Sequence, residues 1–225
     1  MTQLILWILL GLYAVDVGLH LFACFTRRTK LRRPTKVLLM PLLCGCYWTL
    51  TLALGSRPNA FVIAALLCGC LGDAFLLFPK QGVLLLCGMA AFALGHVLYV
   101  AAMLATEPIL RWPIFVCIAF VLGWVVILRV ALVSKAPKRL HAPGYAYGLL
   151  LSGTAICACY LMLMRRLPNW YMLSFLGGVL FMTSDTILVR REYLRSTRYG
   201  NFWVMLTYIL AQTCLVTGFA LNGGI

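Results

Sequence analysis

The sequence predicts an all-α fold, a polytopic transmembrane helical bundle with eight membrane-spanning helices. The chain has 225 residues, of which 64% are hydrophobic and only 11% are charged. A soluble domain carries about 25% charged residues, so this composition indicates a chain that folds inside a bilayer. Eight apolar runs are each close to the ~20 residues that a helix needs to cross a membrane. We therefore expect one integral membrane domain over residues 1–225 and no separate soluble domain.

Short segments with turn residues or positive charge separate the eight runs. Arg32-Arg33-Pro34 precedes the second run, and Ser56-Arg57-Pro58-Asn59 precedes the third. Pro79-Lys80-Gln81 divides the third run from the fourth, which favours a tight hairpin over one very long helix. The expected spans are residues 4–25, 37–55, 60–78, 82–104, 113–133, 144–164, 171–189 and 202–221.

The positive charge of the chain lies mainly between the expected spans. The formal net charge is +14, from 19 Lys and Arg against 5 Asp and Glu. Basic residues in short loops are typical of topology signals and of contact with anionic lipid, so we expect membrane lipid and no nucleic acid as a partner. The positive-inside rule puts the 26–36 loop in the cytosol and both termini on the non-cytosolic side of a bacterial inner membrane or the endoplasmic reticulum. The sequence does not indicate an oligomeric state.

Two aspartates stand in matching settings, each near the end of an apolar run. Asp73 lies in the third span and Asp185 in the seventh, 112 residues later. A charged side chain in a bilayer costs about 2.5–3.5 kcal/mol on insertion scales, so two of them indicate a functional site. The same shift of 112 residues places His96 of the fourth span on Tyr208 of the eighth. We expect two four-helix repeats, with the two aspartates facing each other across the bundle.

Other polar residues in the spans have two readings each. Asp16 and His20 share one helix face, either as a proton-handling pair or half of a metal site, or as a pair that satisfies itself. The aspartates could instead bond to a neighbouring helix or to Arg129, and His96 could be catalytic or simply buried. Tyr99, Tyr208 and Gln212 could either form helix–helix hydrogen bonds or support the site. Close helix approach is expected at Gly69, Gly72, Gly177 and Gly178.

Two basic residues are candidates for contact with the lipid headgroup. Arg33 and Lys36 stand at the entrance of the second span, where a lipid phosphate would sit.

The ten cysteines lie almost entirely inside apolar spans, where they behave as small hydrophobes. A CxxC motif is absent, so neither a zinc ribbon nor a disulfide framework is expected.

Several short motifs, in order along the chain, resemble the YhhN-like lysoplasmalogenase family. They are Thr35-Lys36 leading into Leu38-Leu39-Met40-Pro41, Gly72-Asp73-Ala74, Gly88-Met89-Ala90-Ala91-Phe92, Gly95-His96-Val97-Leu98-Tyr99-Val100, Leu180-Phe181-Met182-Thr183-Ser184-Asp185, Thr207-Tyr208 and Ala211-Gln212. The resemblance implies eight spans and hydrolysis of the vinyl ether bond of lysoplasmalogens to a fatty aldehyde and glycerophosphoethanolamine or glycerophosphocholine. It also implies that Asp73 and Asp185 are the essential carboxylates. The first span is not matched, so no role passes to Asp16 or His20.

The residues suit this chemistry without a metal or another cofactor. A vinyl ether hydrolyses by protonation at carbon, and water then adds to the resulting oxocarbenium ion. Two carboxyl groups in different surroundings supply the acid and the base in glycosidases, whose transition state is similar. Burial favours the neutral form of a carboxyl group. Asp73, flanked by Leu71 and Phe75, is therefore expected to be the acid, and Asp185, beside Ser184 and other hydroxyl residues, the base.

Two alternatives remain open on the sequence. The first is a metal-dependent membrane lipid hydrolase, ceramidase-like, that uses Asp16, His20, Asp73 and His96. The chain has only three histidines, and His141 falls in a loop, so a three-histidine zinc site is not expected. The second is a lipid or small-solute transporter in which Asp73 and Asp185 relay protons. No expected span carries the Gly/Pro interruption that is typical of a broken transport helix.

Overall fold

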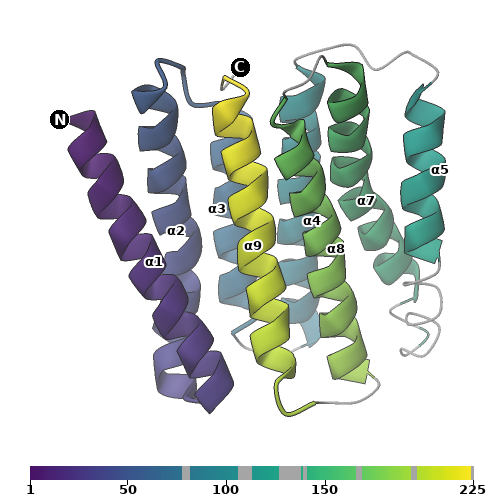
Figure 1. The fold of residues 1–225 in the computed structure, drawn as a ribbon. Coiled ribbons are helices and arrows are strands. Elements are labelled where there is room, and N and C mark those ends of the chain that lie inside the picture. Colours follow the sequence, from purple (N-terminus) through teal and green to yellow (C-terminus); the bar gives the residue numbers. More distant parts are fainter. Residues whose placement is uncertain are drawn as a thin grey trace. The chain divides into compact units, whose positions relative to one another are not determined.

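The fold is described by a computed structural model, which covers residues 1–77, 82–105, 113–126, 138, 141–165, 169–193 and 197–223. All its regular elements over these residues are helices, as the sequence predicts (Figure 1). They are α1 (Thr2–Thr26), α2 (Thr29–Ala53), α3 (Ala60–Phe75), α4 (Gly82–Leu104), α5 (Pro113–Val125), α7 (His141–Met164), α8 (Tyr171–Tyr193) and α9 (Gly200–Leu221).

Six of these helices are long and apolar enough to cross a membrane, which confirms a multi-pass helical membrane protein. They are α1, α2, α4, α7, α8 and α9. The other two are shorter, with 16 residues in α3 and 13 in α5. The expected third and fifth spans run on into residues 78–81 and 127–133, which lie outside the described residues, as does Arg129.

The chain forms two compact units. The first unit comprises Met1–Ala102 with Phe219–Ile225, and the second comprises Met103–Gly218. The boundary between Ala102 and Met103 falls in the last turn of α4, close to the point where the two halves of the expected repeat would meet. The symmetry of the halves stays a prediction.

The main departure from the expected elements is the start of α2. The segment 26–36 was expected to be a loop, but α2 begins at Thr29, and only Arg27 and Arg28 separate it from α1. Arg27 takes the left-handed conformation, at φ 60°, and so closes a tight helical hairpin. Pro34 lies in the second turn of α2, where it removes one backbone hydrogen bond without ending the helix. Arg32, Arg33 and Lys36 therefore stand on a helix, which fixes the face that each occupies.

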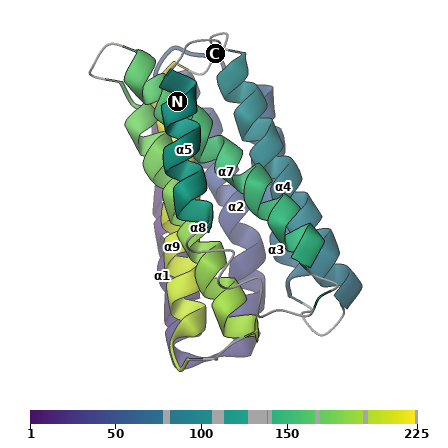
Figure 2. The same cartoon turned by 90° about the vertical axis from the view of Figure 1, so that its right-hand side faces the viewer.

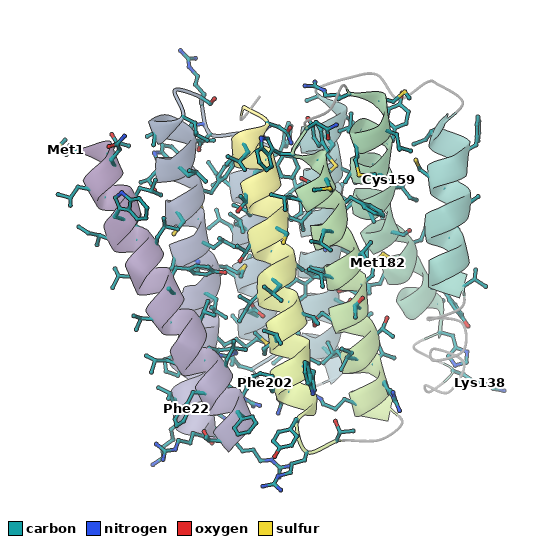
Figure 3. The ribbon with its side chains drawn as sticks, in the orientation of Figure 1. Met1, Phe22, Lys138, Cys159, Met182 and Phe202 are labelled. Atoms are coloured by element: carbon teal, nitrogen blue, oxygen red, sulfur yellow. The ribbon has the colours of Figure 1, made fainter. Side chains whose placement is uncertain are left out.

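The burial pattern of α1 is the reverse of that in a soluble helix. Its polar residues Asp16 and His20 are buried, whereas Trp7, Val15 and Phe22 are at least half exposed. Figure 3 labels Phe22 near the lower end of α1. Apolar side chains pointing outward and polar ones pointing inward are expected when the surroundings are lipid. This pattern supports a lipid-facing position for α1.

Pro41 on α2 and Cys70 on α3 take part in a polar contact between these two helices. Pro41 has no backbone N–H, so it leaves the carbonyl of Val37, four residues earlier, without its helical partner. The thiol of Cys70 on α3 donates to this carbonyl, with an S···O distance of 3.7 Å. At the other end of α3, Asn59 caps the helix by accepting the N–H of Phe61 at 2.8 Å. The contact between Cys70 and Val37 therefore helps to fix the register of α3 on α2.

Glycines allow α3 and α4 to approach closely within the first unit (Figure 2). A Cβ on Gly72 would lie 2.7 Å from the ring of Phe92, and one on Gly95 would lie 3.2 Å from the carbonyl oxygen of Ala65. The close approach expected at Gly72 is thus confirmed. This contact packs the turn that carries Asp73 against α4.

The second unit uses the same device around α8. A Cβ on Gly177 would lie 2.7 Å from the carbonyl oxygen of Ala211 on α9, and one on Gly178 would lie 3.0 Å from Ala155 on α7. The close approach expected at these two glycines is also confirmed. The helix that carries Asp185, α8, therefore packs closely against both α7 and α9.

Candidate active site

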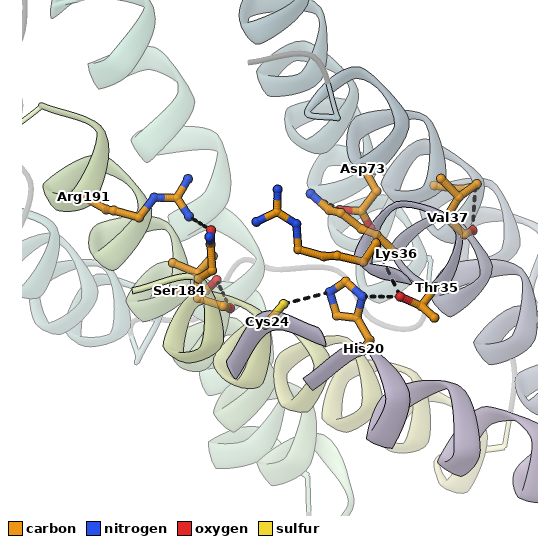
Figure 4. Close-up of polar contacts among 12 residues, drawn as sticks. His20, Cys24, Thr35, Lys36, Val37, Asp73, Ser184 and Arg191 are labelled. Carbon is orange, nitrogen blue, oxygen red and sulfur yellow. Dashed lines mark hydrogen bonds and ion pairs between the residues drawn. The ribbon is translucent and has the colours of Figure 1, made fainter. Parts of the chain in front are cut away.

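Asp73 forms a buried ion pair with Lys36. The side chain of Asp73 is 2% exposed, and its Oδ1 lies 3.2 Å from the Nζ of Lys36 on α2, whose side chain is 13% exposed (Figure 4). The apolar setting expected for Asp73 is therefore wrong, because the ammonium group beside it compensates a negative charge. An adjacent cation favours the ionised form of a carboxyl group.

His20 connects α1 to α2 one residue before Lys36. Its Nδ1 lies 2.8 Å from the Oγ1 of Thr35, and its Nε2 lies 3.5 Å from the sulfur of Cys24 (Figure 4). The hydroxyl of Thr35 donates its proton to the carbonyl of Leu31 at 2.9 Å. Thr35 therefore accepts from the Nδ1 of His20. This network fastens α1 to α2.

Asp16 lies one helical turn from His20 but does not bond to it. Both ring nitrogens of His20 are engaged elsewhere, so the expected self-satisfied pair is wrong. Asp16 is 7% exposed, and its Oδ2 has no hydrogen-bond partner among the described residues. A buried oxygen in this condition costs free energy, typically about 1–3 kcal/mol.

His96 and Tyr99 are buried together on α4. They are 2% and 1% exposed, and their rings meet edge to face at a centroid distance of 6.0 Å. Tyr99 also stacks on Phe219, with centroids 5.7 Å apart. These ring contacts fix both side chains in the first unit.

In the second unit, the hydroxyl groups around Asp185 are committed to the backbone. Thr183 donates to the carbonyl of Val179 at 2.9 Å, Ser184 to that of Val204 on α9 at 2.9 Å, and Thr186 to that of Met182 at 2.7 Å. Each hydroxyl has a single proton, so none of the three donates to Asp185 in this arrangement. The expectation that these neighbours solvate the carboxyl group is therefore wrong. Asp185 itself is 7% exposed.

Tyr208 and Gln212 lie one turn apart on α9 and are buried, at 5% and 2% exposure. The ring of Tyr208 meets Phe181 of α8 edge to face, with centroids 5.6 Å apart. Nearer the end of α8, the guanidinium of Arg191 donates to the side-chain oxygen of Asn201. These contacts join α8 to α9 around the segment that contains Asp185.

The structure thus places some of the candidate residues in the first unit and the others, including Asp185, in the second. In the first unit it joins Asp73 to Lys36, whereas Arg33 is exposed. Sequence reasoning missed Thr35 and Arg32 on the same stretch, because their positions depend on α2 beginning at Thr29. Among the described residues, no three His, Cys, Asp or Glu side chains gather as metal ligands would.

Long apolar helices, together with buried carboxyl groups on α1, α3 and α8, define an integral membrane protein with polar residues in its interior. A family model described as the YhhN family matches residues 31–219, so the chain belongs to the YhhN family, the family of lysoplasmalogenases. Neither the curated proteins nor the solved structures contain a match to the chain. The matched region includes Lys36, Asp73 and Asp185 but begins after α1, so Asp16 and His20 lie outside it.

Proposed function

We propose that the protein is a lysoplasmalogenase that hydrolyses the alkenyl ether bond of lysoplasmalogens. The products are a fatty aldehyde and glycerophosphoethanolamine or glycerophosphocholine. Family membership supports a lysoplasmalogenase-like function. The observation that carries the proposal is a buried carboxylate in each unit, in two different chemical settings, because vinyl ether hydrolysis needs both an acid and a base.

The contacts favour Asp73 as the base and Asp185 as the acid, the reverse of the sequence-based expectation. Lys36 compensates the charge of an ionised Asp73 at 3.2 Å. The hydroxyl groups beside Asp185 donate to backbone carbonyls and do not stabilise a charge on it. The reaction also needs a carboxyl group that keeps its proton until it meets the double bond, and this role then falls to Asp185.

In the proposed reaction, Asp185 gives its proton to the outer carbon of the double bond, and an oxocarbenium ion forms at the inner carbon. The carboxylate of Asp73 stabilises this cation and takes a proton from the water that attacks it. The resulting hemiacetal then collapses. Its hydroxyl group returns a proton to Asp185, the bond from this carbon to the glycerol oxygen breaks, and that oxygen takes the proton held by Asp73. The sum is the addition of one water molecule, which leaves an aldehyde and an alcohol.

The test is aldehyde release from purified protein incubated with alkenyl lysophospholipid. Acyl and alkyl analogues of equal chain length should inhibit without being cleaved, because neither is protonated at carbon to give the cation. An ester would need a nucleophile, and the sequence has no Gly-x-Ser-x-Gly elbow to provide one. Fatty acid release from the acyl analogue at a rate equal to aldehyde release would refute the two-carboxylate mechanism.

We also propose that both termini are non-cytosolic. The support is the concentration of Lys and Arg in the turn and first helical turns of α2, together with the positive-inside rule. Reporter fusions at Met1 and at Ile225 should both report the non-cytosolic side. A cytosolic signal at Ile225 would overturn this orientation without affecting the proposed chemistry.

A further inference from the structure

One face of α2 carries two cations in succession, at Arg32 and Lys36. Residues four apart lie on one helix face, about one turn of 5.4 Å along the axis. Both positive charges act on His20, which places Arg32 on the inward side of α2 together with Lys36. Arg32 is half-buried, whereas the next residue, Arg33, is exposed.

The two cations differ in how their charge is balanced. Lys36 is paired with Asp73. The first unit has only one other side-chain carboxyl group, that of Asp16, and the Oδ2 of Asp16 bonds to no described residue. Among the described residues, the guanidinium of Arg32 has no hydrogen bond or ion pair.

We propose that Arg32 binds the phosphate of the lysophospholipid substrate, a role that rests on the proposed function. A guanidinium offers paired N–H donors whose geometry fits two phosphate oxygens, so it suits a phosphodiester better than an ammonium does. Three glycerol carbons and one oxygen separate the ether oxygen from the phosphorus. This length is comparable to the single helical turn between Arg32 and Lys36, about 5.4 Å. With its phosphate on Arg32, the substrate presents its ether bond at the level of Asp73.

The test compares two substrates and three variants of the full-length protein. The substrates are alkenyl lysophosphoethanolamine and the corresponding alkenyl glycerol, which keeps the reacting bond but has no phosphate. Arg32→Gln removes the proposed contact, and Arg33→Gln removes the contact that the sequence favoured. Arg57→Gln is the matched control, because Arg57 is an exposed arginine beyond the other end of α2.

Arg32→Gln should raise KM for the phosphate-containing substrate at least tenfold, leave kcat within about threefold, and leave the cleavage of alkenyl glycerol unchanged. Arg57→Gln should behave as the wild type on both substrates. Inorganic phosphate and glycerophosphate as competitors should show whether the whole lipid is needed for binding at Arg32. Equal losses on both substrates, or a phosphate-specific loss from Arg33→Gln alone, would overturn the proposal.

A binding measurement tests the role of Arg32 independently of the proposed function. The alkyl ether analogue retains the phosphate and resists cleavage, so its affinity for the wild type and for Arg32→Gln is measurable even if neither substrate is hydrolysed. Absence of hydrolysis by the wild type would reject the proposed function. Equal affinity of the analogue for both proteins would reject the role of Arg32, whatever the activity.

Discussion

Asp73 and Asp185 stand in similar sequence settings but in different chemical ones. In the first unit, the neighbouring helix brings an ammonium group within 3.2 Å of Asp73. In the second unit, three hydroxyl groups next to Asp185 along the chain donate to backbone carbonyls instead. The shift of 112 residues that relates the aspartates places Gly148 where Lys36 would have its counterpart. The position in the second half that corresponds to Lys36 is therefore not a cation.

This difference teaches how two aspartates in similar sequence settings can acquire the different roles that the proposed mechanism gives them. A lysine on a neighbouring helix favours the ionised form of Asp73, since a nearby opposite charge stabilises a buried carboxylate. Four predictions test this comparison, beginning with the largest expected effect.

If one aspartate acts as the acid and the other as the base, removal of either should nearly abolish the reaction. Asp73→Asn and Asp185→Asn should each lower kcat by about 10²–10⁴, the usual contribution of an acid–base group. The double variant should be scarcely slower than either single one, because groups that act as a unit are not additive. Aldehyde release under single-turnover conditions measures this effect, with helicity by circular dichroism as the control for folding. Substantial turnover by one variant would remove that aspartate from the mechanism.

Lys36→Met should damage stability as well as activity, because it leaves a buried charge without its partner. Breaking a buried pair in this way costs about 3–5 kcal/mol. Lys36→Met combined with Asp73→Asn should recover most of the lost thermal stability but no activity. Lys36→Arg keeps the charge and should retain part of both properties.

The same set of variants separates a structural role from a role in the reaction. Thermal unfolding in one detergent gives the stability, and aldehyde release gives the activity. If Lys36→Met were as stable as the wild type, the ion pair would not be the compensating contact that we infer.

Replacing a close-packed glycine with alanine should lower the stability of the protein more in the second unit than in the first. At Gly177 the added Cβ would meet backbone atoms of Ala211 and Leu215 at 2.7–2.8 Å, so α8 must move away from α9. At Gly72 it would meet only the ring of Phe92, which can rotate. Gly177→Ala should therefore lower the melting temperature more than Gly72→Ala. Gly11→Ala is the control: nothing lies within 4 Å of its Cβ, so it should gain about 0.5–1 kcal/mol from helix propensity.

The smallest effect is expected at Asp16, which is buried in the same unit as Asp73 but lies outside the family match. Asp16→Leu removes a carboxyl group whose Oδ2 is unsatisfied and should raise stability slightly, by about 1 kcal/mol. Activity should remain within twofold of the wild type. A loss comparable to that of Asp73→Asn would place Asp16 in the mechanism and restore the idea of a second proton-handling group.

The sequence predicts the helices well because long apolar runs leave the backbone no alternative in a bilayer. The expected span 82–104 coincides with α4, and 171–189 lies within α8. The start of α2 could not be predicted, because Pro34 and the charges around it are equally typical of a loop. The partner of Asp73 could not be predicted either. It lies 37 positions away on another helix, and its contact depends on the register that Pro41 and Cys70 help to set.

The ion pair between Lys36 and Asp73 also bears on how the protein would withstand its own product. Each turnover of the proposed reaction releases a fatty aldehyde next to Asp73, and lysine amines can condense with aldehydes to form imines. The carboxylate 3.2 Å away holds the side chain of Lys36 in an ion pair, so the aldehyde is released beside a lysine that is already engaged.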